Sequence, residues 1–254
     1  MSKPEPVLSF QSLGLPSELI QALEDVGYET PSPIQLGAIP PLLEGRDLLG
    51  HAPTGTGKTA AFGLPILHKI EVDRKLPQAI ILCPTRELCL QITRDIETYS
   101  KYIKRAKTTA VYGGASIVPQ MKSLKSGTQI VVGTPGRVID LINRKALRLQ
   151  DIEFVVLDEA DEMLSMGFKK ELDEILSFLS NTENKWLFSA TLPSEIKHMI
   201  NQHMSEKAHR ILVSKGYVIN SNIEHKFVLC DDQEKFNVLL QFLNTVKKER
   251  GIIF

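Results

Sequence analysis

A glycine-rich segment that ends in a lysine and a threonine has the composition of a phosphate-binding loop. It reads Ala-Pro-Thr-Gly-Thr-Gly-Lys-Thr over residues 52–59, between an apolar run and an amphipathic stretch. Glycines let the backbone curl so that successive N–H groups point at phosphate oxygens, and a following helix adds its positive end. We therefore expect nucleotide binding, with Lys58 on the outer phosphates and Thr59 on Mg²⁺. The loop residues assigned to the nucleotide are Thr54, Gly55, Thr56, Gly57, Lys58 and Thr59.

An acidic cluster at residues 158–161, Asp-Glu-Ala-Asp, directly follows the apolar run Phe154–Leu157. In open parallel sheets, ligands bind at the carboxyl ends of the strands. Asp158 is expected to hold Mg²⁺ through water, because this ion keeps much of its hydration shell. Glu159 is expected to orient and deprotonate the attacking water. Either motif alone could be a turn or a solvated helix start. Together they predict hydrolysis, with Lys58, Asp158 and Glu159 as the catalytic residues.

Short runs of aliphatic and β-branched residues alternate with amphipathic stretches, and these elements must position the two motifs. Strands that alternate with helices predict β-α-β units in a parallel sheet. Several runs are apolar on both faces, which is typical of a sheet covered by helices on both sides. We therefore expect an α/β fold with a mostly parallel sheet and helices on both faces. The predicted strands are Asp47–Gly50, Ala79–Cys83, Thr108–Tyr112, Gln129–Gly133, Phe154–Leu157, Trp186–Ser189 and Arg210–Val213.

The organisation along the chain predicts one sheet domain and the start of another. Two helices precede the first strand, and Pro40-Pro41 should kink or end the second, because proline lacks the N–H that a helix interior needs. The sheet domain is predicted to span residues 1–214, followed by a polar linker at 215–222. Residues 223–254 are too few to build a core of their own.

The charge balance argues against a generally basic surface. The 254 residues include 30 Lys plus Arg and 30 Asp plus Glu. Binding to nucleic acid would therefore depend on a local site. No segment approaches the roughly 20 apolar residues of a membrane span, and Met1–Phe10 has no apolar signal core. We expect a cytoplasmic protein without membrane contact, in which Cys83, Cys89 and Cys230 are reduced.

Seven short motifs, in their order along the chain, resemble those of the DEAD-box RNA helicases. They are Gly27–Gln35, Ala52–Thr59, Pro84–Leu88, Gly113–Gly114, Thr134–Arg137, Asp158–Asp161 and Ser189–Thr191. The phosphate loop of this family has the form A-x-T-G-x-G-K-T, which accounts for Ala52. The similarity extends along essentially the whole chain and includes Glu162–Phe168, where it is greatest to bacterial cold-shock and ribosome-assembly members. The resemblance implies a RecA-like P-loop NTPase domain.

The resemblance also implies ATP, with Mg²⁺, as the ligand. The first of the seven motifs looks like the Q motif, so Gln35 would recognise adenine. An amide suits this role because it offers both a donor and an acceptor to the base edge. Phe10 and Tyr28 would stack on the base or buttress it. For both aromatic residues the alternative is ordinary core packing.

A sequence-independent grip on the RNA backbone is implied by further motifs. Hydroxyl, cationic and glycine residues of the kind they contain hold phosphates and sugars rather than base edges. For Arg86 and Arg137 the alternative is a surface or helix-capping charge. The residues implied in RNA binding are Pro84, Thr85, Arg86, Gly113, Gly114, Thr134, Pro135, Gly136 and Arg137. Ser189, Ala190 and Thr191 would link the nucleotide site to strand separation.

A second RecA-like domain, whose arginines complete the ATP site, is the last implication of the resemblance. Gly251–Phe254 looks like the start of its first motif. The 254 residues alone are therefore expected to bind ATP as a monomer but to hydrolyse it poorly. Two other classes remain open: a P-loop enzyme with a small substrate, such as a kinase, and a non-catalytic, ATP-gated RNA-binding module. The residues do not exclude DNA as the bound strand.

Overall fold

The computed structural model describes residues 9–180, 182, 184–213 and 226–245. The chain divides into two units, Met1–Lys215 and Gly216–Phe254. In the second unit the described residues include the helix α10 (Lys235–Thr245). The linker predicted at 215–222 lies outside the described residues. Within the described part of the chain, no helix has the length and apolar character that crossing a membrane requires.

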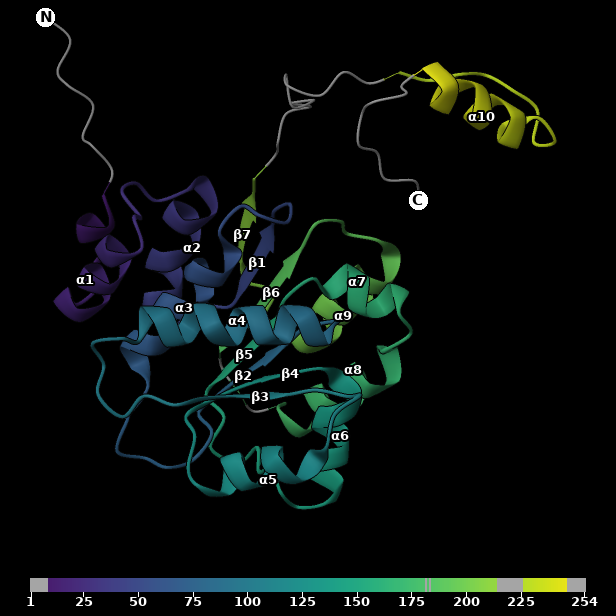
Figure 1. Ribbon diagram of the computed structural model, residues 1–254. Coiled ribbons are helices and arrows are strands. Elements are labelled where there is room, and N and C mark those ends of the chain that lie inside the picture. The colour runs from purple at the N-terminus through teal and green to yellow at the C-terminus, as the bar shows by residue number, and fades with distance from the viewer. Residues whose placement is uncertain (1–8, 181, 183, 214–225, 246–254) are drawn as a thin grey trace, which may run out of the picture. The chain divides into compact units, whose positions relative to one another are not determined.

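A parallel sheet of seven strands forms the centre of the first unit (Figure 1). Its spatial order is β3-β4-β2-β5-β6-β1-β7. The strands are β1 (Leu48–His51), β2 (Ala79–Leu82), β3 (Thr108–Val111), β4 (Ile130–Gly133), β5 (Phe154–Leu157), β6 (Asn184–Ser189) and β7 (His209–Leu212). Each predicted run overlaps one of these strands, with bounds that differ by at most two residues. The predicted fold class is therefore confirmed.

Two layers of helices cover the sheet and bury its aliphatic side chains on both faces. One hydrophobic cluster lies under η1 (Phe10–Leu13), α1 (Ser17–Asp25), α2 (Pro33–Leu43), α3 (Lys58–Lys69) and α4 (Arg86–Tyr99). The other lies under α5 (Ile117–Lys125), α6 (Pro135–Asn143), α7 (Ala160–Ser165), α8 (Lys169–Phe178) and α9 (Ser194–His203). Every residue of β2, β4 and β5 is buried, which explains why these strands are apolar throughout.

Pro40-Pro41 was predicted to kink or end the second helix, and α2 does not end at these prolines. It continues through both prolines to Leu43, with Glu44 as its C-cap. Pro41 and Leu42 are buried against the core. Tertiary packing therefore carries the helix two residues past the second proline, although proline removes backbone hydrogen bonds from the last turn.

The carboxyl ends of three adjacent strands bring the predicted motifs to one edge of the sheet. β5, β6 and β1 are neighbours in that order. β5 ends at Leu157, directly before Asp158, and β1 ends at His51, directly before the phosphate loop. β6 ends at Ser189, the first residue of a further motif. The fold thus places the acidic cluster, the 189–191 segment and the phosphate loop beside one another.

Candidate functional site

The phosphate loop connects β1 to α3, and its conformation depends on glycine. Gly57 is the N-cap of α3 and has φ 91°, in the left-handed region that favours glycine. A Cβ atom at Gly57 would also overlap the side-chain amide of Gln35. Lys58 and Thr59 therefore begin α3 at the point where the loop turns into the helix, so that the positive end of the helix faces the loop.

Lys58 and two carboxylates form a buried charge cluster at the mouth of this loop. The Nζ atom of Lys58 lies 2.7 Å from Glu159 Oε1 and 3.7 Å from Asp158 Oδ1. The hydroxyl of Thr54 also donates to Glu159 Oε1, at 2.9 Å. Lys58 is 5% exposed and Asp158 is 2% exposed, so the cluster is largely screened from solvent. All three residues predicted to be catalytic are therefore brought together.

The environment of the Asp158 carboxylate favours the binding of a cation. Burial raises its pKa to about 6, and the negative charge of Glu159 adds to this rise, although Lys58 opposes it. The backbone N–H of Glu159 donates to Asp158 Oδ1 at 3.1 Å. A buried carboxylate that lines the same cavity as Thr59 fits a Mg²⁺ ion completed by water and phosphate oxygens.

A cavity of about 240 Å³ contains most of the residues assigned to the nucleotide. It is lined by Tyr28, Thr54, Gly55, Gly57, Lys58, Thr59, Leu88, Gln91, Asp95, Tyr99, Asp158 and Glu159. The four lining residues from α4 were not predicted from the sequence. They are Leu88, Gln91, Asp95 and Tyr99. Their spacing of three or four residues marks one face of a helix, and this signal could have identified them once α4 was known to border the loop.

Gln35 supports the phosphate loop, and both atoms of its side-chain amide already have partners. Its Nε2 donates to Gly57 O at 3.1 Å, and its Oε1 accepts from Ser32 N at 2.8 Å. Gln35 is 2% exposed and is absent from the lining of the 240 Å³ cavity. Each amide atom retains one further hydrogen-bonding position, so the predicted adenine contact stays a prediction.

The two aromatic residues assigned to the base occupy different positions. Phe10 is 2% exposed and packs edge-on against Tyr28, with ring centroids 6.0 Å apart. Tyr28 lines the nucleotide cavity, and its hydroxyl lies 3.3 Å from that of Tyr99. Both rings also line an adjoining hollow of about 270 Å³. Phe10 therefore contacts the Tyr28 ring but lines only the second hollow, whereas Tyr28 lines both.

The residues implied in RNA binding follow three adjacent strands, β3, β4 and β2. Pro84 is buried, and the side chain of Thr85 caps α4 by accepting from Leu88 N at 3.2 Å. The exposed guanidinium of Arg86 lies 5.0 Å from the centre of the Tyr112 ring. Tyr112 directly precedes Gly113 and Gly114, both exposed. The segments after β2 and β3 are thus in contact.

The segment after β4 joins the same surface through Arg137. Thr134 is the N-cap of α6 and Pro135 occupies its first turn, while Gly136 is exposed. Nη2 of Arg137 donates to Ala115 O at 2.9 Å, one residue beyond Gly114. Its Nη1 is buried and has no hydrogen-bond partner within the residues that the structure describes. A guanidinium nitrogen with an unused hydrogen suits an anionic oxygen.

The segment 189–191 is held by the acidic cluster. The backbone N–H and the hydroxyl of Thr191 both donate to Asp161 Oδ2, at 2.9 and 2.7 Å. Ser189 is fully buried and donates to Thr191 O at 2.6 Å. Burial raises the pKa of Asp161, but the hydrogen bonds from Thr191 and Ser189 outweigh it and leave this pKa below its ordinary value. Asp161 is therefore a carboxylate that ties this segment to the Asp-Glu-Ala-Asp cluster.

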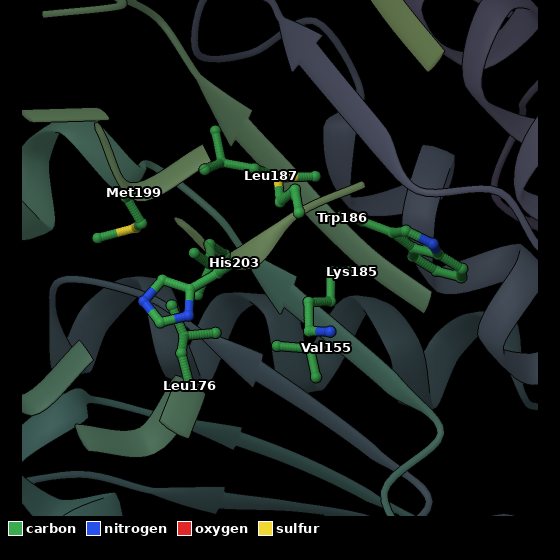
Figure 2. A pocket seen from close by; sticks show the side chains of 9 residues that line it. Val155, Leu176, Lys185, Trp186, Leu187, Met199 and His203 are labelled. Carbon is green, nitrogen blue, oxygen red and sulfur yellow. The ribbon is translucent and has the colours of Figure 1, made fainter. Parts of the chain in front are cut away.

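A separate cavity below β6 belongs to the core rather than to a ligand site. It measures about 10 Å³ and lies among Val155, Leu176, Leu187 and Met199, with His203 at its side (Figure 2). A space of this size holds about one water molecule at most. Trp186, the single tryptophan, also lines this cavity and is 1% exposed, so it packs in the core.

Comparison with known proteins identifies the family of the chain. The family model for "DEAD/DEAH box helicase" matches residues 32–199. Over 246 residues, the chain is 44% identical to the DEAD-box ATP-dependent RNA helicase CshA of Bacillus cereus, covering 97% of this chain and 46% of the relative. It is 43% identical over 247 residues to the protein of the same name from Streptococcus pneumoniae, covering 97% of this chain and 47% of that protein. The chain thus spans about half the length of these curated relatives.

A solved structure agrees with the sequence relatives. The crystal structure of a DEAD box protein from the hyperthermophile Methanococcus jannaschii superposes with a TM-score of 0.78 at 39% sequence identity. The match covers 93% of this chain and 63% of that one. It confirms the RecA-like fold predicted from the resemblance. The chain belongs to the DEAD/DEAH box helicase family.

Proposed function

We propose that the protein is an ATP-dependent RNA helicase whose described sheet domain binds ATP and one face of the RNA backbone. The observation that carries the proposal is the buried cluster of Lys58, Asp158 and Glu159 at one end of the 240 Å³ cavity. A lysine that faces two carboxylates in a phosphate loop suits the binding and cleavage of a triphosphate. The names of the sequence relatives add RNA as the substrate class.

Within this proposal, the phosphate loop binds the triphosphate, and Thr59 and Asp158 hold Mg²⁺. A bound Mg²⁺ would neutralise the negative charge that develops on the phosphate oxygens. Lys58 has to leave Glu159 in order to reach the phosphates, because its Nζ is 2.7 Å from that carboxylate in the structure. Nucleotide binding would thereby release Glu159, whose carboxylate then orients a water molecule and accepts its proton.

The RNA-binding residues after β2, β3 and β4 are proposed to grip phosphates and sugars. Three observations support this proposal: the exposed Gly113 and Gly114, the cation of Arg86 beside them, and the unused nitrogen of Arg137. Groups of these kinds usually contact phosphates and sugars rather than base edges, so we propose binding that does not depend on the RNA sequence. Ser189, Ala190 and Thr191 are proposed to couple this surface to the nucleotide.

The domain assignment also remains a proposal: a RecA-like domain over 1–214, a linker over 215–222 and the start of a second RecA-like domain over 223–254. We propose that a second RecA-like domain closes the ATP site with arginines, and that the protein acts as a monomer in the cytoplasm. The 254-residue chain alone is then a slow ATPase, because an arginine supplied across a γ-phosphate contributes roughly 10³–10⁵ in rate.

The test is steady-state ATP turnover, with and without RNA. It is run on the 254-residue chain and on a chimera that carries the remaining half of the Bacillus cereus relative. RNA should stimulate turnover by the chimera, and the chain alone should remain well below roughly 1 s⁻¹, the low end of ordinary turnover. A single-stranded DNA of the same sequence serves as the matched control for the choice of strand.

Three outcomes would contradict parts of this proposal. Turnover that ignores RNA in both forms would favour a P-loop enzyme with a small substrate. Binding of both ATP and RNA without any turnover by the chimera would favour an ATP-gated binding module. Rapid turnover by the 254-residue chain alone would mean that an arginine within this chain completes the site.

A further inference from the structure

His51 occupies the junction between β1 and the phosphate loop and was not among the predicted site residues. It is the last residue of β1 and stands directly before Ala52. Its register partner on β6 is Ser189, and Ala52 N donates to Ser189 O at 3.1 Å. On the other side, Val213 N donates to His51 O at 2.9 Å. The backbone at His51 is therefore fixed between β6 and β7.

The side chain of His51 makes a contact that is separate from the backbone hydrogen bonds between the strands. Its Nε2 lies 2.7 Å from Ala190 O. A carbonyl oxygen can only accept, so Nε2 carries the hydrogen and donates it. Nδ1 is buried and has no hydrogen-bond partner in the described part of the chain. Within that part, the imidazole is thus held by this one hydrogen bond, which crosses from the start of the phosphate loop to the segment after β6.

The segment that receives this bond is already anchored at its other end. Thr191, the residue after Ala190, donates twice to Asp161 Oδ2. Ser189, the residue before it, turns its hydroxyl back onto Thr191 O. Besides the backbone bond from Ala52 N to Ser189 O, residues 189–191 therefore form a tight turn with two side-chain attachments: the carboxylate of Asp161 on one side and the imidazole of His51 on the other.

We propose that His51 is a positioning residue that holds the 189–191 turn, and through Thr191 the carboxylate of Asp161, in a fixed place relative to the phosphate loop. His51 does not line the nucleotide cavity. Its effect therefore passes through Ala190 and does not require contact with substrate. Because the two attachments act on adjacent residues of one turn, loss of the first should loosen the second. The consequence for turnover rests on the proposed function, but the hydrogen-bond arrangement does not.

Two amide variants separate the hydrogen bond from the bulk of the side chain. In His51→Gln the amide nitrogen can occupy the position of Nε2, so a donor still reaches Ala190 O. In His51→Asn the same amide is one carbon closer to the backbone and falls short of that oxygen. Both replacements are polar and uncharged, so they differ chiefly in reach. Thermal unfolding of each variant serves as the check that the fold is kept.

The first measurement is amide hydrogen exchange at Thr191 in the nucleotide-free protein. In wild type, the Thr191 N–H is protected by its bond to Asp161. We expect exchange to be faster by roughly three- to tenfold in His51→Asn, which is the scale of one hydrogen bond in a local opening, and to return to the wild-type rate in His51→Gln. Equal exchange rates in all three proteins would overturn the proposal, whether or not the protein proves to be an ATPase.

The second measurement is RNA-stimulated turnover in the chimera that carries the remaining half of the Bacillus cereus relative. His51→Asn should lower kcat by a similar factor at saturating ATP and RNA and leave the KM for ATP unchanged, because His51 does not touch the nucleotide cavity. His51→Gln should restore kcat. A raised KM with unchanged kcat, or an equal loss in both variants, would contradict positioning by a donor at Nε2. Absence of turnover in wild type would count against the proposed function, and the exchange measurement would then decide the role of His51.

Discussion

Lys58 and Glu159 form the shortest of the charge contacts in the nucleotide cavity, and this contact joins the phosphate loop to the acidic cluster. The 2.7 Å distance between Nζ and Oε1 means that each group neutralises the other in the nucleotide-free protein. Glu159 also adopts φ 51°, a left-handed conformation that is uncommon for a residue with a side chain. Glu159 is therefore a strained residue whose carboxylate is paired with Lys58. We expect a bound triphosphate to draw Lys58 away and so release this carboxylate.

The variant Glu159→Gln tests this role directly. The glutamine can still accept from Lys58 and Thr54, but it cannot take a proton from water at neutral pH. We expect nucleotide affinity to be kept or increased, because Lys58 loses the nearer of its two negative partners, and single-turnover hydrolysis to fall by roughly 10²–10⁴-fold. Glu162→Gln is the matched control, since Glu162 is exposed on the following helix. Hydrolysis of ATP at the wild-type rate by Glu159→Gln would remove this residue from the mechanism.

Gln35 permits a second test at the residue scale, because one of its hydrogen bonds supports the phosphate loop at Gly57 and each amide atom retains one further hydrogen-bonding position. Gln35→Ala should reduce the preference for ATP over GTP by about 1–3 kcal/mol, the range of a good bidentate contact to a base. The readout is the ratio of the two affinities. Ser32→Ala is the control, because it removes the bond from Ser32 Oγ to Thr56 O and should weaken both nucleotides alike. Equal affinity for ATP and GTP in wild type would contradict the assignment of Gln35.

At the scale of single elements, α9 carries a half-buried titratable group, His203. Burial lowers the pKa of His203 from its ordinary value of 6.5, although Asp173, with Oδ1 3.8 Å from Nε2, opposes this effect. The neutral form is therefore favoured in the folded protein. The unfolded chain takes up the proton first as the pH falls, so this contribution to stability is present above about 6.5 and decreases below it.

The corresponding prediction concerns the pH dependence of stability. Between pH 7.5 and 5.5, the free energy of unfolding should fall less in His203→Gln than in wild type, as measured by urea denaturation. His198→Gln is the matched control, because His198 is exposed on the same helix, and it should behave as wild type does. The same loss in all three proteins would show that His203 does not contribute. The comparison uses the change with pH, so a constant destabilisation from the substitution does not affect it.

The elements also show which parts of the structure the sequence predicts. All seven strands were predicted, and the signal is strongest for β2, β4 and β5, which are buried throughout and leave apolar runs that end near polar motifs. The continuation of α2 past Pro40-Pro41 was not predicted, because it depends on the burial of Pro41 and Leu42 against other elements. The lining of the cavity by Gln91 and Asp95 was missed for a similar reason. Their helical face is visible in the sequence, but the packing of α4 beside the phosphate loop is a tertiary fact.

The same distinction separates His51 from the motifs. Phosphate loops and acidic clusters are recognisable because their chemistry requires particular residue types at fixed spacing. His51 acts on Ala190, and the two residues become neighbours only because β1 and β6 pair in a particular register. No pattern within one segment could reveal this contact. The ion pair between Lys58 and Glu159 could not be predicted for the same reason, since the two residues come together only when the sheet forms.

At the scale of the whole molecule, the proposed RNA binding would have to arise without a favourable net charge. Lys plus Arg equals Asp plus Glu at 30 each, so long-range attraction of a polyanion is weak. The proposed RNA surface contributes Arg86 and Arg137 beside backbone groups of exposed glycines. Because the proposed surface offers few cations, we expect few counterions to be released on binding and a shallow dependence of affinity on salt.

This expectation gives a quantitative test, since the slope of log affinity against log salt counts the phosphates that protein cations neutralise. Arg86→Ala and Arg137→Ala should each reduce the slope by about one unit or less and weaken binding to unrelated single-stranded RNAs about equally. Arg94→Ala is the control, because Arg94 is exposed on α4, the helix that Arg86 begins, yet outside the proposed surface. A loss in Arg137→Ala that differs strongly between RNA sequences would mean that this arginine reads a base. An unchanged slope in both variants would mean that the RNA binds elsewhere on the protein.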